Sequence, residues 1–299
     1  MGWRILYIEE SDNVCSYLDN VKVKRSSDEI LIPYKDIHTI IIDNYKTYLT
    51  TNFLIKCAEN KINLIICGLE HLPISYVLPI SGNIQTPLVL SKQLEWSDSI
   101  KANVQKIIIK GKIENQIEVL EKNNCDKAVI DKLKEFKEEV KIGDVTNREG
   151  LAAKMYFREL FGKEFIRFSD DIVNASLNYG YTIIRTQISK VLISKGLNTC
   201  IGFFHRGIDN NFNLSDDIIE VFRPIIDDFV LNNCVNKERF SREDRLNLIK
   251  LSTKNMLYHN QTNTFLNVIN MYISEILEKI TTNKIEEIEI PLVKYSWGI

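Results

Sequence analysis

Three separate segments of this sequence place a carboxylate or an imidazole where folding alone does not require one. Glu149 lies in the run NREGLAAKMYF, whose glycine and alanines would let another backbone approach closely. His205 ends the run GLNTCIGFFH, and Glu220 lies in the run NLSDDIIEVFRP. Two carboxylates and one imidazole from separate elements match a mixed oxygen and nitrogen site for a hard divalent cation, Mg²⁺ or Mn²⁺.

Such a site would favour phosphoryl-transfer chemistry. Three side chains do not complete the coordination shell of a divalent ion, so the open positions would go to water and to a phosphate oxygen. The sequence contains no Ser/His/Asp arrangement, no phosphate-binding P-loop and no dinucleotide-binding glycine motif. His205 could instead orient a leaving group or transfer a proton, because imidazole titrates near neutral pH.

Each of the three segments also has a purely structural explanation. Glu149 would stand in the first turn of a helix, where a carboxylate complements the helix dipole. His205 could be a core histidine with satisfied hydrogen bonds. Glu220 could form a capping pair with Asp217. Spacing does not decide between these explanations and a metal site, because many helical proteins contain two glutamates and a histidine.

The part of the chain that carries these residues is expected to be helical. Beyond about residue 97, apolar side chains recur three and four positions apart, which is the spacing of an amphipathic helix. The expected helices cover 97–122, 126–138, 147–162, 169–195, 241–259 and 262–281, and another opens at Ser215. On the helix that begins near Asn147, Glu149 and Tyr156 share one face. Pro224 should kink the helix that carries Glu220, because proline removes a backbone donor.

The beginning of the chain is expected to be rich in strands. Short runs of branched and aromatic residues are separated there by turn-forming residues. The expected strands cover 3–9, 14–24 with a turn at Asp19-Asn20, 30–32, 37–43, 62–67 and 74–80, and one helix covers 50–59. Gly82, Asn83 and Pro87 indicate a linker. The sequence therefore predicts an α+β fold, with a small β-rich domain at 1–80, a linker at 81–96 and a larger all-α domain at 97–299.

Charge and composition limit the classes of function. The formal net charge of −2 argues against a protein that coats nucleic acid by bulk positive charge. DNA contacts would need local basic groups, and the candidates are Lys22, Lys24 and Arg25; Lys101, Lys106, Lys110 and Lys112; and Arg239, Arg242 and Arg245. Each group could equally be an ordinary solvated face. Six cysteines without a CxxC pair, and no apolar run long enough to cross a bilayer, predict a soluble, cytoplasmic protein.

Four stretches resemble, in the same order, the signature blocks of the CRISPR-associated endonuclease and integrase of spacer acquisition, the Cas-one family. They are residues 147–157, 170–184, 196–205 and 213–227. The β-rich start and the helical remainder also fit this family, and its type II branch is the most similar. The resemblance implies that Glu149, His205 and Glu220 are the catalytic residues and the ligands of Mg²⁺ or Mn²⁺.

Other positions match family blocks without carrying the chemistry. The matched residues are Asn174, Asn178, Tyr179 and Gly180, which the resemblance places on a long helix beneath the site, and the Phe-Arg-Pro element with Arg223 and Pro224. Asp216 and Asp217 lie where some relatives supply an extra carboxylate, so the acidic ligand stays open between them and Glu220. Arg206 and Arg223 are candidate DNA contacts because they lie near the expected ligands. One departure is that Asn198-Thr199-Cys200 occupies a loop where many relatives carry a proline.

The resemblance also implies a reaction and an assembly. The 3′-hydroxyl of a short foreign DNA would attack a phosphodiester of the CRISPR repeat, and reversal or hydrolysis at the same site would account for endonuclease activity. Two copies would pair through their β-rich domains, and two such dimers would flank a dimer of the Cas-two protein. Cas-nine and other type II adaptation proteins are further expected partners in this antiviral defence.

Two other functions remain open at this stage. One is a stand-alone, structure-selective nuclease for branched DNA, which would use the same metal chemistry without Cas-two. The other is a non-catalytic helical scaffold that binds DNA or partner proteins, in which Glu149, His205 and Glu220 would be structural.

Overall fold

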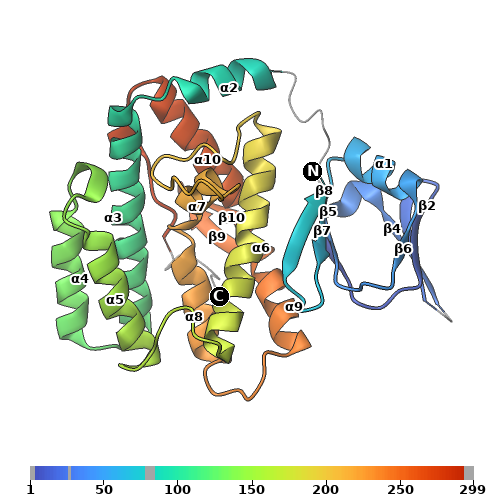
Figure 1. Cartoon of the computed structure of the whole chain (residues 1–299), viewed down its shortest axis with the longest axis horizontal. Helices are drawn as coiled ribbons and strands as arrows, with labels where there is room; N and C mark the ends of the chain where they lie inside the picture. The colour runs from blue at the N-terminus through green and yellow to red at the C-terminus, as the bar shows by residue number, and fades with distance from the viewer. Residues whose placement is uncertain (1–3, 26–27, 78–84, 293–299) are drawn as a thin grey trace. The chain divides into compact units, whose positions relative to one another are not determined.

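The computed structural model describes residues 4–25, 28–77 and 85–292, and the chain divides into two compact units, Met1–Ile84 and Gln85–Ile299. The first unit is built from strands and the second mainly from helices (Figure 1). This confirms the α+β fold class with a β-rich beginning. Within the described residues, no helix is long and apolar enough to cross a membrane.

The first unit contains two four-stranded sheets. One has the order β1-β5-β7-β8, with β1 (Arg4–Ile8), β5 (Ile37–Ile42) and β7 (Asn63–Cys67) parallel and β8 (Pro73–Val77) antiparallel. The other has the order β4-β3-β2-β6, formed by β4 (Glu29–Pro33), β3 (Asn20–Lys24), β2 (Asn13–Tyr17) and β6 (Tyr48–Leu49). Helix α1 (Thr51–Glu59) begins after Thr50, whose hydroxyl accepts a hydrogen bond from the amide of Phe53.

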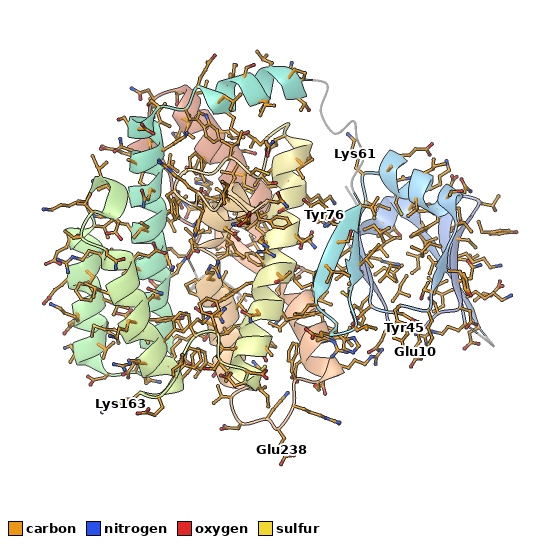
Figure 2. The ribbon with its side chains drawn as sticks, viewed as in Figure 1. Glu10, Tyr45, Lys61, Tyr76, Lys163 and Glu238 are labelled. Carbon is orange, nitrogen blue, oxygen red and sulfur yellow. The ribbon has the colours of Figure 1, made fainter. Side chains whose placement is uncertain are left out.

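The core of this unit explains its strand sequences. Every residue of β5, IHTIII, is buried, as expected for a parallel strand covered on both faces. Ile40 and Leu64 are fully buried in one cluster with Phe53 of α1. Tyr45, by contrast, lies in a loop with its side chain exposed to solvent (Figure 2).

Nine helices are described in the second unit, with one hairpin. They are α2 (Thr86–Leu94), α3 (Asp98–Lys122), α4 (Lys127–Glu139), α5 (Arg148–Phe161), α6 (Ile172–Ser194), α7 (Asn213–Ile219), α8 (Arg223–Asn233), α9 (Arg242–Leu251) and α10 (Phe265–Thr281). Short 3₁₀ helices lie at Tyr34–Asp36 in the first unit and at Ile142–Asp144 and Ile285–Glu287 in the second. Helix α3 packs against α4, α5 and α8, and α6 packs against α7, α8, α9 and α10 (Figure 1). The side chains of neighbouring helices pack against one another in the interior of this unit (Figure 2). Lys163 and Glu238, by contrast, lie in exposed loops.

The expected all-α character of this part, and the expected helix at 241–259, need a correction. Helix α9 ends at Leu251, and β9 (Asn255–Tyr258) pairs antiparallel with β10 (Gln261–Thr264). The turn between them is His259-Asn260, and both residues have positive φ angles, 51° and 57°. Two consecutive residues in this conformation make the turn that matches the twist of a two-residue hairpin.

The expected linker at 81–96 also needs a correction. Residues 86–94 form helix α2, and 81–84 lie outside the described residues. Pro87 had suggested a break, but it lies in the first turn of α2, where a missing backbone donor costs no hydrogen bond. Gln93 of this helix is fully buried, so the segment belongs to the folded unit.

Pro224 separates two helices and does not kink one. Helix α7 ends at Ile219, α8 begins at Arg223, and Pro224 occupies the first turn of α8. Ser215 is not the N-cap of α7 as expected, because that helix begins at Asn213 and the Ser215 hydroxyl bonds to Ser189 in the interior at 2.8 Å. Glu220 therefore lies at the junction between α7 and α8.

Gly180 tests the packing of α6 against α8. A Cβ at this position would lie 2.5 Å from Cγ2 of Ile226, a contact too short to be accommodated without movement. We expect Gly180→Ala to lower the free energy of unfolding by about 1–3 kcal/mol through overpacking. Urea denaturation measures the change.

The matched control is Gly150→Ala on α5. The three atoms nearest to its Cβ would all belong to the end of the Asn147 side chain, which can move aside, and alanine favours the helix by about 1 kcal/mol. We expect this variant to be as stable as the wild type or more stable. Equal effects of the two substitutions would contradict the packing described for Gly180.

Candidate functional site

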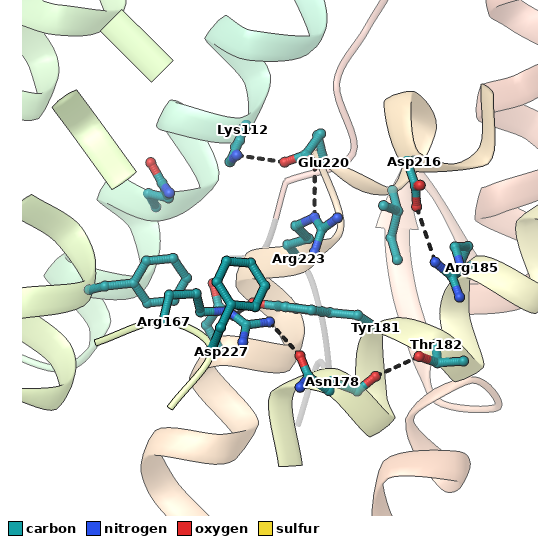
Figure 3. Close-up of a pocket in the computed structure, with 14 residues that line it drawn as sticks. Lys112, Arg167, Asn178, Tyr181, Thr182, Arg185, Asp216, Glu220, Arg223 and Asp227 are labelled. Carbon is teal, nitrogen blue, oxygen red and sulfur yellow. Dashed lines mark hydrogen bonds and ion pairs between the residues drawn. The ribbon is translucent and has the colours of Figure 1, made fainter. Parts of the chain in front are cut away.

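A polar cavity of about 360 Å³ opens among the helices of the second unit. Its lining comes from α3, α5, α6, α7 and α8 and from the segment that precedes α6. The charged side chains of the lining are Lys112, Arg167, Arg185, Asp216, Glu220, Arg223 and Asp227 (Figure 3). Four cations and three carboxylates around one cavity make it a candidate site for a negatively charged substrate.

Two of the three predicted ligands converge on a single cation. Glu149 enters from the first turn of α5, and Glu220 enters from the α7–α8 junction. The ammonium of Lys112 on α3 lies 2.6 Å from Oε1 of Glu149 and 2.6 Å from Oε2 of Glu220. The side chains of Glu220 and Lys112 are only 4% and 12% exposed, so these charges interact with little screening by water.

Arg223 supplies a second positive charge to Glu220. Its Nε donates to Oε1 of Glu220 at 2.9 Å, and its guanidinium lies 4.6 Å from the ring centre of Tyr181 (Figure 3). Burial by itself would raise the pKa of Glu220, but Arg223 and Lys112 outweigh burial and lower it to about 2. Glu220 is therefore an ionised carboxylate in the interior of the protein.

The third predicted ligand is held by Asp217. Its carboxylate is fully buried and accepts hydrogen bonds from the backbone amides of Phe203 and His205 and from Nδ1 of His205 at 2.7 Å. These bonds fix both the loop and the ring, and they leave Nε2 as the nitrogen that can bind a ligand. Burial lowers the pKa of His205, but the hydrogen bond that its ring donates to Asp217 and the negative charges of Asp217, Glu220 and Asp216 together outweigh burial, so the net pKa is raised.

The predicted linker contributes to this loop as well. The side-chain amide of Gln93 donates to the carbonyls of Asn198 and Ile201, each at 2.9 Å. The ring of Trp96 stacks on Phe203 with centroids 4.8 Å apart. The loop at Asn198-Thr199-Cys200 is thus held by contacts with α2 and with Trp96, two residues after α2.

The donor set fits a divalent ion in part. Oε2 of Glu220 is buried and makes no hydrogen bond, although it lies 2.6 Å from the Lys112 ammonium. A buried oxygen that contacts a cation without hydrogen-bond geometry is one that a metal ion can also contact. Among the described residues, however, no three His, Cys, Asp or Glu side chains are grouped closely enough to hold one ion. His205 influences Glu220 electrostatically, and the sharing of one ion by all three ligands stays a prediction.

A second buried carboxylate lies deeper in the cavity. Asp227 accepts hydrogen bonds from the hydroxyls of Tyr181 and Tyr156, the latter at 3.1 Å. Burial raises the pKa of Asp227 to about 7, because two neutral hydroxyls stabilise the anion less than a cation would. Tyr156 therefore links α5 to α8 through this hydrogen bond.

The remaining predicted residues separate into lining and surface. Asn178 lines the cavity and accepts from Arg167 at 2.7 Å, and Asn174 accepts from the same guanidinium at 2.7 Å. Arg223 lines the cavity, whereas Arg206 is not among the residues that line it in the described chain. The Arg206 side chain is 71% exposed and lies 3.8 Å from Asp98.

Sequence reasoning missed the part that Lys112 and Arg167 play here. Lys112 was grouped with surface lysines, although it follows Gly111 and precedes Ile113, both of which are buried on the same helix. Lys110 has neighbours of the same kind, because Ile109 and Gly111 are also buried, so no local pattern separated the two lysines. Arg167 lies between helices, and no pattern in the sequence marked it.

Comparisons with known proteins identify the family of this chain. The family described as CRISPR associated protein Cas1 matches residues 6–268. The CRISPR-associated endonuclease Cas1 of Neisseria meningitidis serogroup C (strain 8013) is 34% identical over 227 residues, which are 76% of this chain and 74% of that protein. Two solved structures share the fold with a TM-score of 0.74. A casposase bound to integration product is 20% identical, with coverage of 100% of this chain and 95% of that one. A Cas6-RT-Cas1–Cas2 complex is 18% identical, with coverage of 96% and 36%.

Asp217→Asn tests whether this carboxylate holds the loop of His205. Asparagine would place an amide group against backbone donors, so we expect a loss of about 2–4 kcal/mol in the free energy of unfolding. Hydrogen exchange at the amides of Phe203 and His205 should become faster. The control is Asp216→Asn, because Asp216 bonds Asn210 at 2.8 Å and not the loop amides. Unchanged exchange in Asp217→Asn would contradict the proposed anchoring.

Asp227→Asn tests the raised pKa of this carboxyl. The pKa of an unfolded aspartate is about 3.9, so between pH 4 and 7 the folded protein binds more protons than the unfolded chain. Asp227 therefore lowers the stability of the wild type progressively as the pH rises through this window. Asparagine does not titrate, so the unfolding free energy of the variant minus that of the wild type should increase from pH 4 to pH 7. A difference that is constant with pH would refute the raised pKa.

Proposed function

The chain belongs to the CRISPR-associated Cas1 family, and we propose that it is a divalent-metal-dependent DNA endonuclease and integrase that inserts short foreign DNA into a CRISPR array. The observation that carries the proposal is the convergence of Glu149 and Glu220, from separate helices, on one cation beside an arginine-lined cavity. Carboxylates are the ligands that Mg²⁺ and Mn²⁺ prefer, and the cavity offers positive charge to a phosphate backbone.

In the proposed reaction, the 3′-hydroxyl of the incoming DNA attacks a phosphodiester of the repeat, and the leaving 3′-oxygen departs with a proton. Glu149, Glu220 and Nε2 of His205 would hold the ion, which when bound polarises the phosphate and neutralises developing charge. Asp217 keeps the His205 ring oriented. Water in place of the DNA hydroxyl would give hydrolysis, which accounts for endonuclease activity at the same site.

The cationic lining suggests how the DNA is held. Arg167 is fixed by Asn174 and Asn178, and Arg185 lies against the ring of Phe212 at 4.5 Å. Guanidinium groups that are already held in place lose little freedom when they bind phosphate oxygens. We therefore assign these two arginines, with Arg223, to the DNA backbone in preference to Arg206, which lies outside the lining.

The proposed partners are double-stranded DNA, a second copy of this chain and a Cas2 dimer. The relatives with the same fold include a casposase bound to an integration product and a complex of Cas1 with Cas2, which supports DNA and Cas2 as partners. Pairing of two copies through the β-rich unit, and cooperation with Cas-nine in a type II system, are further proposals. Few bulk positive charges are needed if the DNA path is shared among several subunits.

Glu149→Gln and Glu220→Gln test the metal mechanism. Each substitution keeps the shape of the side chain and removes a charged ligand, so we expect strand transfer to fall at least about 100-fold. The measurement is joining of a labelled DNA end to a repeat-containing target, with Mg²⁺ or Mn²⁺, with excess chelator, and with an end that lacks its 3′-hydroxyl.

The control is Glu135→Gln, because Glu135 on α4 is exposed and pairs with Lys132 away from the cavity. It should transfer strands at the wild-type rate. Cleavage of branched DNA without any joining would favour the stand-alone nuclease. Unchanged activity in Glu149→Gln and Glu220→Gln, or activity in excess chelator, would refute the metal mechanism.

A further inference from the structure

Lys112 occupies an unusual place for a lysine. Its side chain is 12% exposed, and its ammonium contacts the carboxylate of Glu149 on α5 and the carboxylate of Glu220 at the α7–α8 junction. Figure 3 shows the contact with Glu220. The backbone at this point of α3 is closely held. A Cβ at Gly111 would lie 2.7 Å from Ile290, and Asn115 donates to the carbonyls of Val221 and Pro291 at 2.7 and 2.9 Å.

The charges at this point cancel without a metal. Glu149 and Glu220 contribute two negative charges, and Lys112 and Arg223 contribute two positive charges, all within direct contact distance. A buried ion pair is tolerated only when each charge has a partner of the opposite sign. Lys112 therefore allows the two carboxylates to be buried together in the absence of any metal.

The same position is the one that a divalent ion would need. A divalent ion held by Glu149 and Glu220 would need the same two oxygens that the ammonium contacts at 2.6 Å, so the ion and the ammonium would compete for them. Lysine has a flexible four-carbon stem, and the cavity that Lys112 lines offers space for its head to move. The backbone is held by packing and hydrogen bonds, whereas the charged end of the side chain is held by its two ion pairs.

We propose that Lys112 is a tethered counter-ion of the metal site, which holds Glu149 and Glu220 together until a divalent ion displaces its ammonium toward the cavity. The inference rests on the proposed metal site and adds a positioning residue to it. Its physical consequence is an exchange of one cation for another. The metal-free protein gains stability from Lys112, and the affinity for metal is lower than the two carboxylates would give alone.

The test compares Lys112→Met with Lys110→Met. Methionine keeps the length and removes the charge, and Lys110 is a neighbour on the same helix that is paired with exposed Glu138 at 3.4 Å. The measurements are thermal unfolding without metal and Mn²⁺ binding by calorimetry. We expect Lys112→Met to unfold several degrees lower in chelator, because two buried carboxylates lose a partner. We expect it to bind Mn²⁺ at least tenfold more tightly, with Lys110→Met equal to the wild type in both.

Two further variants of the chain serve as controls for metal binding and for folding. Glu149→Gln should lose Mn²⁺ binding, and Lys112→Gln, which can still donate hydrogen bonds to both carboxylates, replaces Lys112→Met if that variant does not fold. One outcome overturns the counter-ion proposal and leaves the proposed function intact. In that outcome the wild type binds Mn²⁺, Glu149→Gln abolishes the binding, and the Lys112 variant binds Mn²⁺ no more tightly than the wild type. A wild type that does not bind Mn²⁺, or a Glu149→Gln variant that binds it as well as the wild type, overturns both.

Discussion

The burial of Glu220 is the constraint on which the rest of this unit depends. A carboxylate removed from water is unstable unless a cation lies beside it, and here the cations come from α3 and α8. Lys112 can reach Glu220 only if α3 packs against the α7–α8 junction with this lysine opposite the glutamate. Arg223 can reach it only if α8 begins directly after the junction. The electrostatic requirement of one side chain thus fixes the relative positions of helices that lie a hundred residues apart in sequence.

Three buried acids in this unit are stabilised in three different ways. Glu220 has two cations in contact and a pKa of about 2, whereas Asp227 has two tyrosine hydroxyls and a pKa of about 7. Asp217 has backbone amides and an imidazole, and burial still raises its pKa. Direct contact with a full positive charge, more than the number of hydrogen bonds, decides which carboxylate stays ionised. Glu220, which the proposed function makes a metal ligand, is the carboxylate that contacts two cations.

Much of the architecture could be predicted because it depends on local patterns. The buried strand at 62–67 and the long helices follow from hydrophobic periodicity. The errors came from residues with two possible structural roles. Pro87 and Pro224 start helices instead of interrupting them. Residues 255–264, expected as the end of one helix and the start of the next, instead form a hairpin that turns at His259-Asn260. Proline and left-handed residues signal a boundary, but only the surrounding packing determines what begins there.

The sequence by itself determined the class of the fold, the family motifs and the identities of Glu149, His205 and Glu220 as candidate ligands. The sequence also placed Asp217 close to Glu220, but it did not determine the role of Asp217. A carboxylate at this distance from Glu220 in the sequence could cap a helix or anchor a loop. Only the tertiary structure decided that Lys112 lies between two glutamates, that Gln93 holds the His205 loop, and that Arg167 lines the cavity while Arg206 does not. The physical reason is that charge pairing between distant helices depends on how those helices pack, and no local sequence pattern encodes that distance.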